Sequence, residues 1–189
     1  MVTVTPMKKH LCSKRGQALV ELTLITPLML LLVFGVVEIG SLISTYLTLT
    51  HTTREGANLT SRGEDPNDAI DAIKAAASPT IRANNSPQWR IIYTRIVQDP
   101  NVECTTAPCN YIVDDQITEG DLDQDSVLGT SKGTIINEKI DGVDSVKPNQ
   151  IFHSIEVYYD YGPNVISFVG KGFNTLLYDR TIFTNVSAI

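Results

Sequence analysis

A peptide bond that a processing enzyme could cut lies at the start of the longest apolar stretch of the chain. Gly16 follows a basic leader, and a glycine leaves the scissile backbone free of the crowding that a Cβ atom causes. Cleavage there would make Gln17 the new N-terminus and Glu21 its fifth residue, one helical turn away. A carboxylate at the mouth of a membrane helix is costly to bury, so we expect Glu21 to compensate a protonated terminal amine of its own chain or of a neighbour.

Three carboxylates at alternate positions, Asp121, Asp123 and Asp125, could converge on a hard cation such as Ca²⁺. The following residues break the EF-hand pattern, because Ser126 stands where a glycine is needed and Lys132 where a bidentate glutamate is needed. An acidic loop that only keeps the surface soluble explains the same residues. No other cofactor is indicated.

Cys104 and Cys109 are separated by four residues, and removal of the leader with Cys12 would leave them as a pair. Outside the cytoplasm such a pair predicts a disulfide that closes a short loop. A metal or redox pair is the alternative, although the two-residue spacing of redox motifs and nearby histidines are missing.

Catalytic chemistry finds little support in the sequence. His10 lies in the leader, His51 lies on the stalk, and His153 shares a strand face with apolar residues. Ser154 is adjacent to His153 but points to the opposite side of a strand, so the two cannot act as nucleophile and base. We therefore expect a protein that is not an enzyme.

The charge distribution divides the chain into a basic leader and an acidic body. The first sixteen residues carry four of the fifteen Lys and Arg and no Asp or Glu, so residues 17–189 carry 11 basic and 21 acidic side chains, a net charge of −10. An acidic body repels phosphate backbones, which disfavours nucleic acid as a partner.

Residues 22–37 are uncharged and mostly aliphatic, and they predict a single membrane span. Sixteen helical residues cover roughly 24 Å, so the span needs an extension, for which the sequence offers Ile39, Leu42, Ile43, Leu47 and Leu49 beyond Glu38. Four cations before the span place the N-terminus in the cytoplasm and the body outside. A cleaved secretory signal is the alternative, although no alanine occurs between Ala18 and Ala57 to form its cleavage site.

Beyond residue 62 the pattern predicts a small α+β head with a mainly antiparallel sheet. Asp65 is the expected N-cap of a short helix that begins at Pro66, ends before Pro79 and packs on the sheet. Its expected apolar face is Ala69, Ile70, Ile73, Ala76 and Ala77. The residues rich in Ile, Val, Tyr and Thr predict strands at 89–98, 111–113, 134–140, 151–161 and 177–189.

The stretch GQALVELTLITPLMLLLVFGVVEIG resembles a type IV prepilin leader and, more closely, the TadE-like minor pilins of tight-adherence (Flp) pili. In that family a Gly, a Glu five residues later, a Pro within the helix and a second Glu followed by Gly recur. They correspond here to Gly16, Glu21, Pro27, Glu38 and Gly40. Residues 53–57, Thr-Arg-Glu-Gly-Ala, resemble the segment that follows the family's helix.

The resemblance implies a cleaved leader at 1–16, a membrane and stalk helix at 17–62, and an extracytoplasmic head at 63–189. It implies processing by a prepilin peptidase, assembly with other pilins and the inner-membrane assembly platform, and a place in the bacterial inner membrane or on the cell surface. Glu21, Pro27 and Glu38 would act in assembly, with a kink or local melting at Pro27. We expect Glu38 near the outer membrane boundary, where it either has the role that its family counterpart suggests or is a solvated carboxylate. A membrane-anchored module that binds a ligand outside the cell is the alternative.

Overall fold

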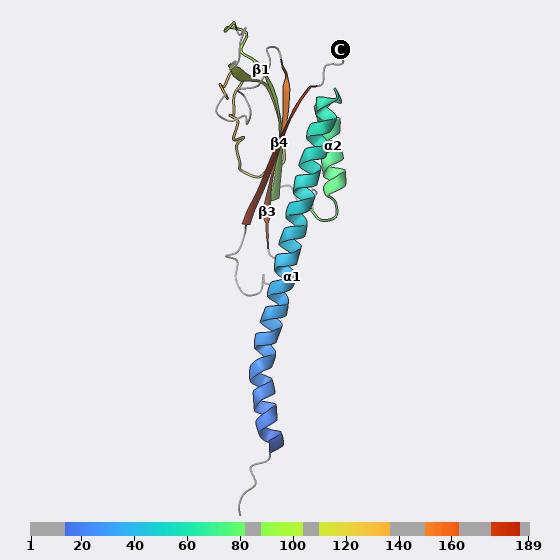
Figure 1. The fold of residues 1–189 in the computed structure, drawn as a ribbon, viewed down its shortest axis with the longest axis vertical. Helices are drawn as coiled ribbons and strands as arrows, with labels where there is room; N and C mark the ends of the chain where they lie inside the picture. The colour runs from blue at the N-terminus through green and yellow to red at the C-terminus, as the bar shows by residue number, and fades with distance from the viewer. Residues whose placement is uncertain (1–13, 82–87, 104–109, 137–149, 163–174, 186–189) are drawn as a thin grey trace, which may run out of the picture.

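The computed structural model describes residues 14–81, 88–103, 110–136, 150–162 and 175–185. Over these residues the chain forms a long N-terminal helix, a short second helix and a four-stranded antiparallel sheet (Figure 1). The first half of the long helix projects away from the sheet, and its second half lies along one sheet face. The predicted α+β fold is confirmed.

Helix α1 (Lys14–Ser61) continues without a break through Pro27. Proline has no N–H and cannot form the usual bond to the carbonyl four residues earlier. Just before it, the Thr23 and Thr26 hydroxyls donate to the carbonyls of Val20 (2.9 Å) and Leu22 (2.7 Å), which accommodates threonine within a helix. The residues on both sides of Pro27 remain helical, so the local melting expected there is not observed.

The two halves of α1 differ in their surroundings. All side chains from Gln17 to Val33 are exposed. From Glu38 onward one face of the helix is buried, with the spacing of three and four residues that places side chains on one side. Leu49 and Ala57 belong to the apolar core of the head. Helix α1 ends at Ser61, close to the expected boundary at residue 62, and its second half packs in the head.

Helix α2 (Pro66–Ala77) begins as predicted. The Asp65 carboxylate accepts a hydrogen bond from the Asn67 N–H at 2.8 Å, and Pro66 occupies the first turn. The buried residues are four of the five that were predicted: Ala69, Ile70, Ile73 and Ala77. The prediction for Ala76 is wrong, since its side chain is exposed at the edge of this stripe.

Helix α2 packs mainly against α1 and also contacts the sheet at β1. Gly56 of α1 makes this approach possible, because a Cβ atom there would lie 2.3 Å from Cδ1 of Ile73. The sequence predicted packing on the sheet alone. The small residues Gly56 and Ala57 are buried on the packed side of α1. Arg54 and Glu55, which come just before them, are exposed.

The sheet has the order β2-β1-β3-β4, and every neighbouring pair is antiparallel. Strand β1 (Trp89–Gln98) has the predicted bounds. Strands β3 (Phe152–Tyr161) and β4 (Thr175–Thr184) overlap the strands predicted at 151–161 and 177–189, of which residues 186–189 lie outside the described part.

Two strand predictions differ from the structure. Strand β2 (Tyr111–Glu119) is six residues longer than predicted, because its polar half pairs with β1 at the edge of the sheet despite few apolar side chains. Of the strand predicted at 134–140, residues 137–140 lie outside the described part. Within that part, Ile135 forms a single bridge to Ile112.

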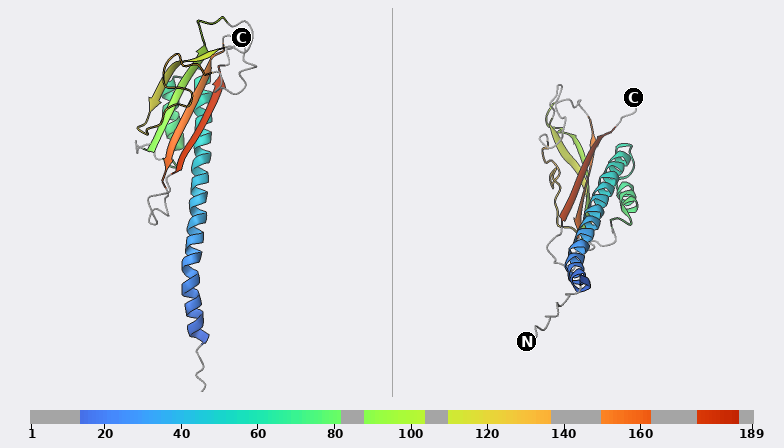
Figure 2. Two further views of the ribbon diagram at one scale, coloured as in Figure 1. Left: turned by 90° about the vertical axis from the view of Figure 1, so that its left-hand side faces the viewer. Right: turned by 60° about the horizontal axis from the view of Figure 1, so that its bottom comes forward.

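The two faces of the sheet have different covers (Figure 2). Alternate side chains of β1 and β3, among them Ile91, Tyr93 and Ile155, join a core with α1 and α2. The opposite face is covered by the connection that follows β2. That connection must pass over β1, since β2 lies at the edge and β3 lies beyond β1. It contributes Leu128 and Ile136 to a second apolar cluster.

Candidate membrane and assembly site

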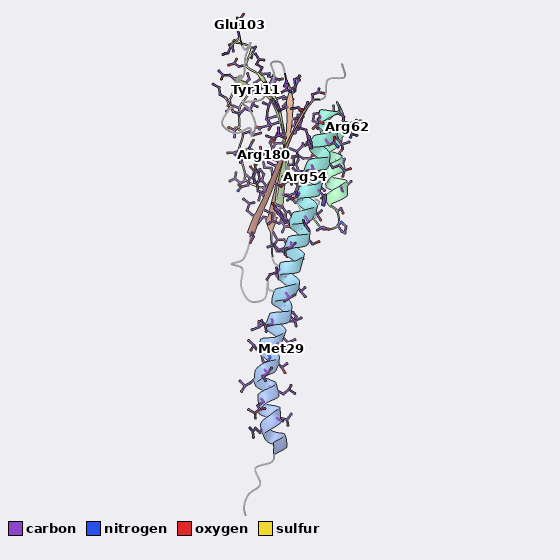
Figure 3. All side chains as sticks on the ribbon, in the orientation of Figure 1. Met29, Arg54, Arg62, Glu103, Tyr111 and Arg180 are labelled. Carbon is purple, nitrogen blue, oxygen red and sulfur yellow. The ribbon has the colours of Figure 1, made fainter. Side chains whose placement is uncertain are left out.

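The exposed half of α1 is long and apolar enough to cross a membrane (Figure 3). Its most apolar window has a mean hydropathy of 2.3 and is 6% buried. The twenty residues 18–37 extend about 30 Å, the thickness of a hydrocarbon core. Part of the predicted extension beyond Glu38 is wrong, because Leu49 is fully buried in the head and Leu42 is half-buried against it. Residues 18–21 supply the missing length instead.

The junction residues lie one turn apart at the exposed end of this helix. The Gln17 side-chain amide donates to Glu21 Oε1 over 3.3 Å, which places the carboxylate beside the residue that cleavage would make N-terminal. Gly16 is open on the side where a Cβ would point, with no atom within 4 Å of that position. The pairing between Glu21 and the amine of a cleaved chain stays a prediction.

Glu38 lies in a different environment from the one expected. Its residue is only 9% exposed, and its Oε1 accepts a hydrogen bond from the Tyr161 hydroxyl at 2.7 Å. Tyr161 ends β3 and is 3% exposed. The prediction of a solvated carboxylate is therefore wrong: Glu38 ties α1 to the sheet at the level where the helix leaves the head.

The acidic residues Asp121, Asp123 and Asp125 lie exposed along the connection after β2. In the part of the chain that the structure describes, no three His, Cys, Asp or Glu side chains are placed to hold a metal ion. The structure thus does not bring these three carboxylates together. Two other acidic residues of the head form ion pairs with lysines: Asp114 with Lys132 at 3.1 Å, and Glu119 with Lys74 at 2.6 Å.

A buried carboxylate that the sequence reasoning missed lies on β3. Glu156 is fully buried and accepts hydrogen bonds from the Ser126 hydroxyl, the Val127 N–H (3.2 Å) and the Tyr178 hydroxyl (2.9 Å). It therefore joins the connection after β2 to β3 and β4. The available signal was a single glutamate between Ile155 and Val157 in a segment that is predicted to be a strand.

The two tyrosines near Glu156 stay protonated at neutral pH. Burial and the negative charge of Glu156 raise the pKa of Tyr158 to about 12, and they also raise the pKa of Tyr178. The Tyr158 hydroxyl donates to the Asp125 carbonyl at 3.0 Å. Both hydroxyls thus remain donors that hold the connection on the sheet.

His153 lies inside the head, as the sequence indicated. It is 8% exposed, and its Nδ1 lies 2.9 Å from the Tyr93 hydroxyl. The neighbouring Ser154 is fully buried on the other side of the strand. This arrangement gives His153 a packing role, with the Tyr93 hydroxyl as its hydrogen-bond partner.

We expect the head to lose stability as the pH falls below about 6.5. Burial, and then the charge of Arg95, lower the pKa of His153 from its ordinary value of 6.5. The unfolded chain therefore takes up the proton at a higher pH than the folded chain, which favours unfolding as the pH falls. Thermal unfolding followed by near-UV circular dichroism should show this loss, and His153→Gln should reduce it. His51→Gln is the matched control, since His51 is exposed on α1. An equal pH dependence for wild type and His153→Gln would contradict the prediction.

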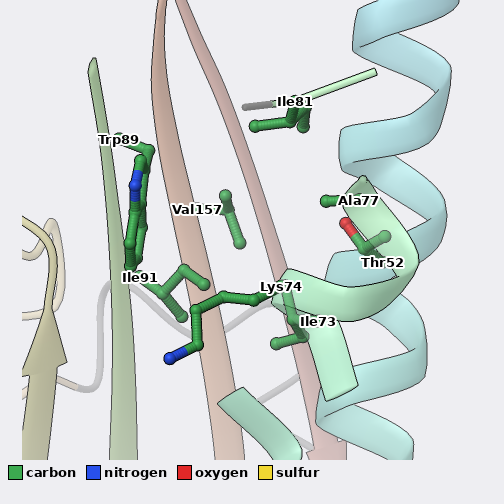
Figure 4. A pocket seen from close by; sticks show the side chains of 8 residues that line it. All are labelled: Thr52, Ile73, Lys74, Ala77, Ile81, Trp89, Ile91 and Val157. Carbon is green, nitrogen blue, oxygen red and sulfur yellow. The ribbon is translucent and has the colours of Figure 1, made fainter. Parts of the chain in front are cut away.

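A small hollow lies between α2 and β1 (Figure 4). Its lining is mostly apolar and includes Ile73, Trp89 and Val157. The Lys74 ammonium is bonded to Asp71 and Glu119, each at 2.6 Å, so its charge is already paired. The other polar side chain of its lining is Thr52, whose hydroxyl donates to the Leu49 carbonyl at 3.0 Å. The predicted disulfide between Cys104 and Cys109 lies outside the described residues.

Comparison with known proteins gives one match. Residues 16–58 match the family of TadE-like proteins, the family that the sequence resembles. The matched segment comprises the exposed half of α1 and most of the half that packs in the head, including Gly16, Glu21, Glu38 and Gly56. No curated protein and no solved structure matches the chain.

Proposed function

We propose that this chain is a minor pilin of a tight-adherence type IV pilus, with a role in assembling or initiating the filament and in surface adhesion. The match to TadE-like proteins supports a pilin-like protein associated with Tad pili. The observation that carries the proposal is the exposed apolar half of α1, with Gly16 at its free end and Glu21 one turn from Gln17. A helix that served only as a tether would need neither residue.

In this proposal the helix spans the bacterial inner membrane once. The basic leader stays in the cytoplasm, and the acidic head lies outside, in agreement with the distribution of positive charge. The partners are a prepilin peptidase, other pilins, the assembly platform and membrane lipid. The role is structural, so it requires no catalytic residue, bound cofactor or nucleic acid.

We expect a prepilin peptidase to cut between Gly16 and Gln17. Gly16→Val should be cut hardly at all, and Gly16→Ala poorly, because each adds a side chain beside the scissile bond. Intact-mass analysis of the membrane-extracted protein would identify the N-terminus. Gly35→Ala is the matched control. A Cβ atom added at Gly35 meets no atom within 4 Å, as at Gly16, but residue 35 lies far from the cut. An uncut wild-type chain, or one that begins beyond residue 40, would contradict the proposal and favour a tether or a secretory signal.

A further inference from the structure

The side of α1 that faces away from the head changes character along its length. At the level where the other side of the helix is already packed in the head, this outer side still carries exposed apolar residues: Ile39 (62%), Ile43 (50%) and Leu47 (53%). Arg54 and Asn58 follow Leu47 on the same side of the helix, seven and eleven residues later, and both are exposed. The outer side therefore turns from apolar to polar between Leu47 and Arg54, while the packed side stays buried.

The outer side at residues 39–47 is suited to apolar surroundings rather than to water. Exposed apolar surface of this kind is unfavourable in water, and a helix side that faces water is normally polar. The threonines of this segment need no hydrogen bond from water, because the Thr45 and Thr48 hydroxyls donate to the carbonyls of Ser41 (2.9 Å) and Ser44 (3.0 Å).

Glu38 is the only Asp, Glu, Lys or Arg between Glu21 and Arg54, and the head shields it. It is 9% exposed, and its carboxylate accepts a hydrogen bond from the Tyr161 hydroxyl at 2.7 Å. A carboxylate in water needs no such shield, whereas one beside lipid does, because an uncovered charge is costly there. With Glu38 covered, the exposed surface of α1 is uncharged from Glu21 as far as Thr50.

This uncharged stretch is as long as a whole bilayer. From Leu22 to Leu47 the helix extends about 38 Å, and a bilayer with its head groups is about 40–45 Å thick. Residues 18–37 match the hydrocarbon core in length, but the charges favour a position a few residues further out. That position places Glu21 among the inner head groups and Arg54 in water on the outer side.

The end of the sheet that is nearest to the exposed half of α1 lies at the same level (Figure 1). Tyr161, which bonds Glu38, ends β3 and pairs with Thr175, the first residue of β4. The next residue, Leu176, is 45% exposed. Since Leu177 joins the core with the helices, Leu176 points to the opposite face of the sheet, away from α1. The head thus has an exposed apolar side chain of its own at this level.

We propose that this end of the head sits in the outer surface of the bilayer, where lipid covers a collar formed by Ile39, Ile43, Leu47 and Leu176. The collar rests on the proposed function, in which α1 spans the membrane. Lipid is the occupant because the collar continues the apolar surface that the bilayer already covers. Its members also point to opposite sides of the head, so a fluid layer can cover all of them, whereas one docked helix cannot.

Quenching by spin-labelled lipids tests this contact. The purified full-length chain with Cys12→Ser is placed in nanodiscs of phosphatidylethanolamine and phosphatidylglycerol at one copy per disc, so that no second copy can cover the collar. A bimane label at Leu47→Cys or Leu176→Cys should be quenched several times more by a lipid with a head-group nitroxide than a label at Asn58→Cys.

Asn58 is the matched control for Leu47, because it is exposed on the same side of α1 about 16 Å further along the helix. The Cys12→Ser chain without an introduced cysteine measures any labelling of Cys104 and Cys109.

Two results would overturn the collar. Equal quenching at positions 47 and 58 would show that lipid does not cover the outer side of α1, and quenching at 47 without quenching at 176 would show that the head does not touch the bilayer. Leu31→Cys separates these results from a failure of the proposed function, since Leu31 is 56% exposed in the middle of the apolar half. Quenching there by a nitroxide on the lipid tails would leave the pilin proposal intact, and its absence would show that α1 does not span the membrane.

Discussion

Glu156→Ala is expected to destabilise the head by on the order of 3 kcal/mol or more. The carboxylate is fully buried, and its removal leaves the Ser126 hydroxyl, the Val127 N–H and the Tyr178 hydroxyl without their acceptor. Each buried donor that loses its partner costs roughly 1–3 kcal/mol, against a total stability of about 5–15 kcal/mol for a typical domain. The connection after β2 should loosen first, because Glu156 joins it to two strands.

Thermal unfolding of the purified protein in detergent, followed by near-UV circular dichroism, would measure this loss. Glu119→Ala is the matched control. Glu119 also belongs to the sheet and also accepts a hydrogen bond, from Lys74, but its side chain is 44% exposed. Loss of an exposed ion pair should cost no more than about 1 kcal/mol. If the two variants unfold at the same temperature, Glu156 does not hold the connection in place.

Glu21→Ala is expected to abolish co-fractionation with filaments or other pilins while leaving membrane insertion intact. Removing a carboxylate from an exposed apolar helix makes insertion easier. It also removes the group that lies one turn from Gln17 and, after cleavage, from a protonated amine. An unpaired positive charge within a bundle of apolar helices is strongly unfavourable, so the assembled state should be lost.

Carbonate extraction would measure insertion, and co-purification with other pilins would measure assembly. Glu38→Gln is the matched control on the same helix. A glutamine can still accept the hydrogen bond from Tyr161, so this variant should keep both the head and assembly. A solvated Glu38 would also make Glu38→Gln mild, through contact with water, but in the structure the reason is the retained bond from Tyr161. Equal assembly by Glu21→Ala and wild type would favour the membrane-anchored ligand-binding module.

The sequence by itself determined the features that depend on neighbouring residues. The apolar run after the basic leader predicted helix α1, and Asp65 followed by Pro66 predicted the start of α2. The richness of residues 89–98 in Ile, Val, Tyr and Thr predicted β1 with its observed bounds. These patterns act through backbone hydrogen bonding and side-chain spacing within a few residues, so they can be read from the chain alone.

Only the tertiary structure decided which polar groups are buried and which half of α1 belongs to the head. Glu38 meets Tyr161 across 123 positions, and Glu156 meets Ser126 across 30. The strand order placed β2 at the edge, so its polar half forms a strand that the local pattern did not indicate. Burial and sheet pairing depend on partners that the fold brings together from distant parts of the chain. A residue's own neighbours in sequence therefore do not determine whether its side chain reaches water.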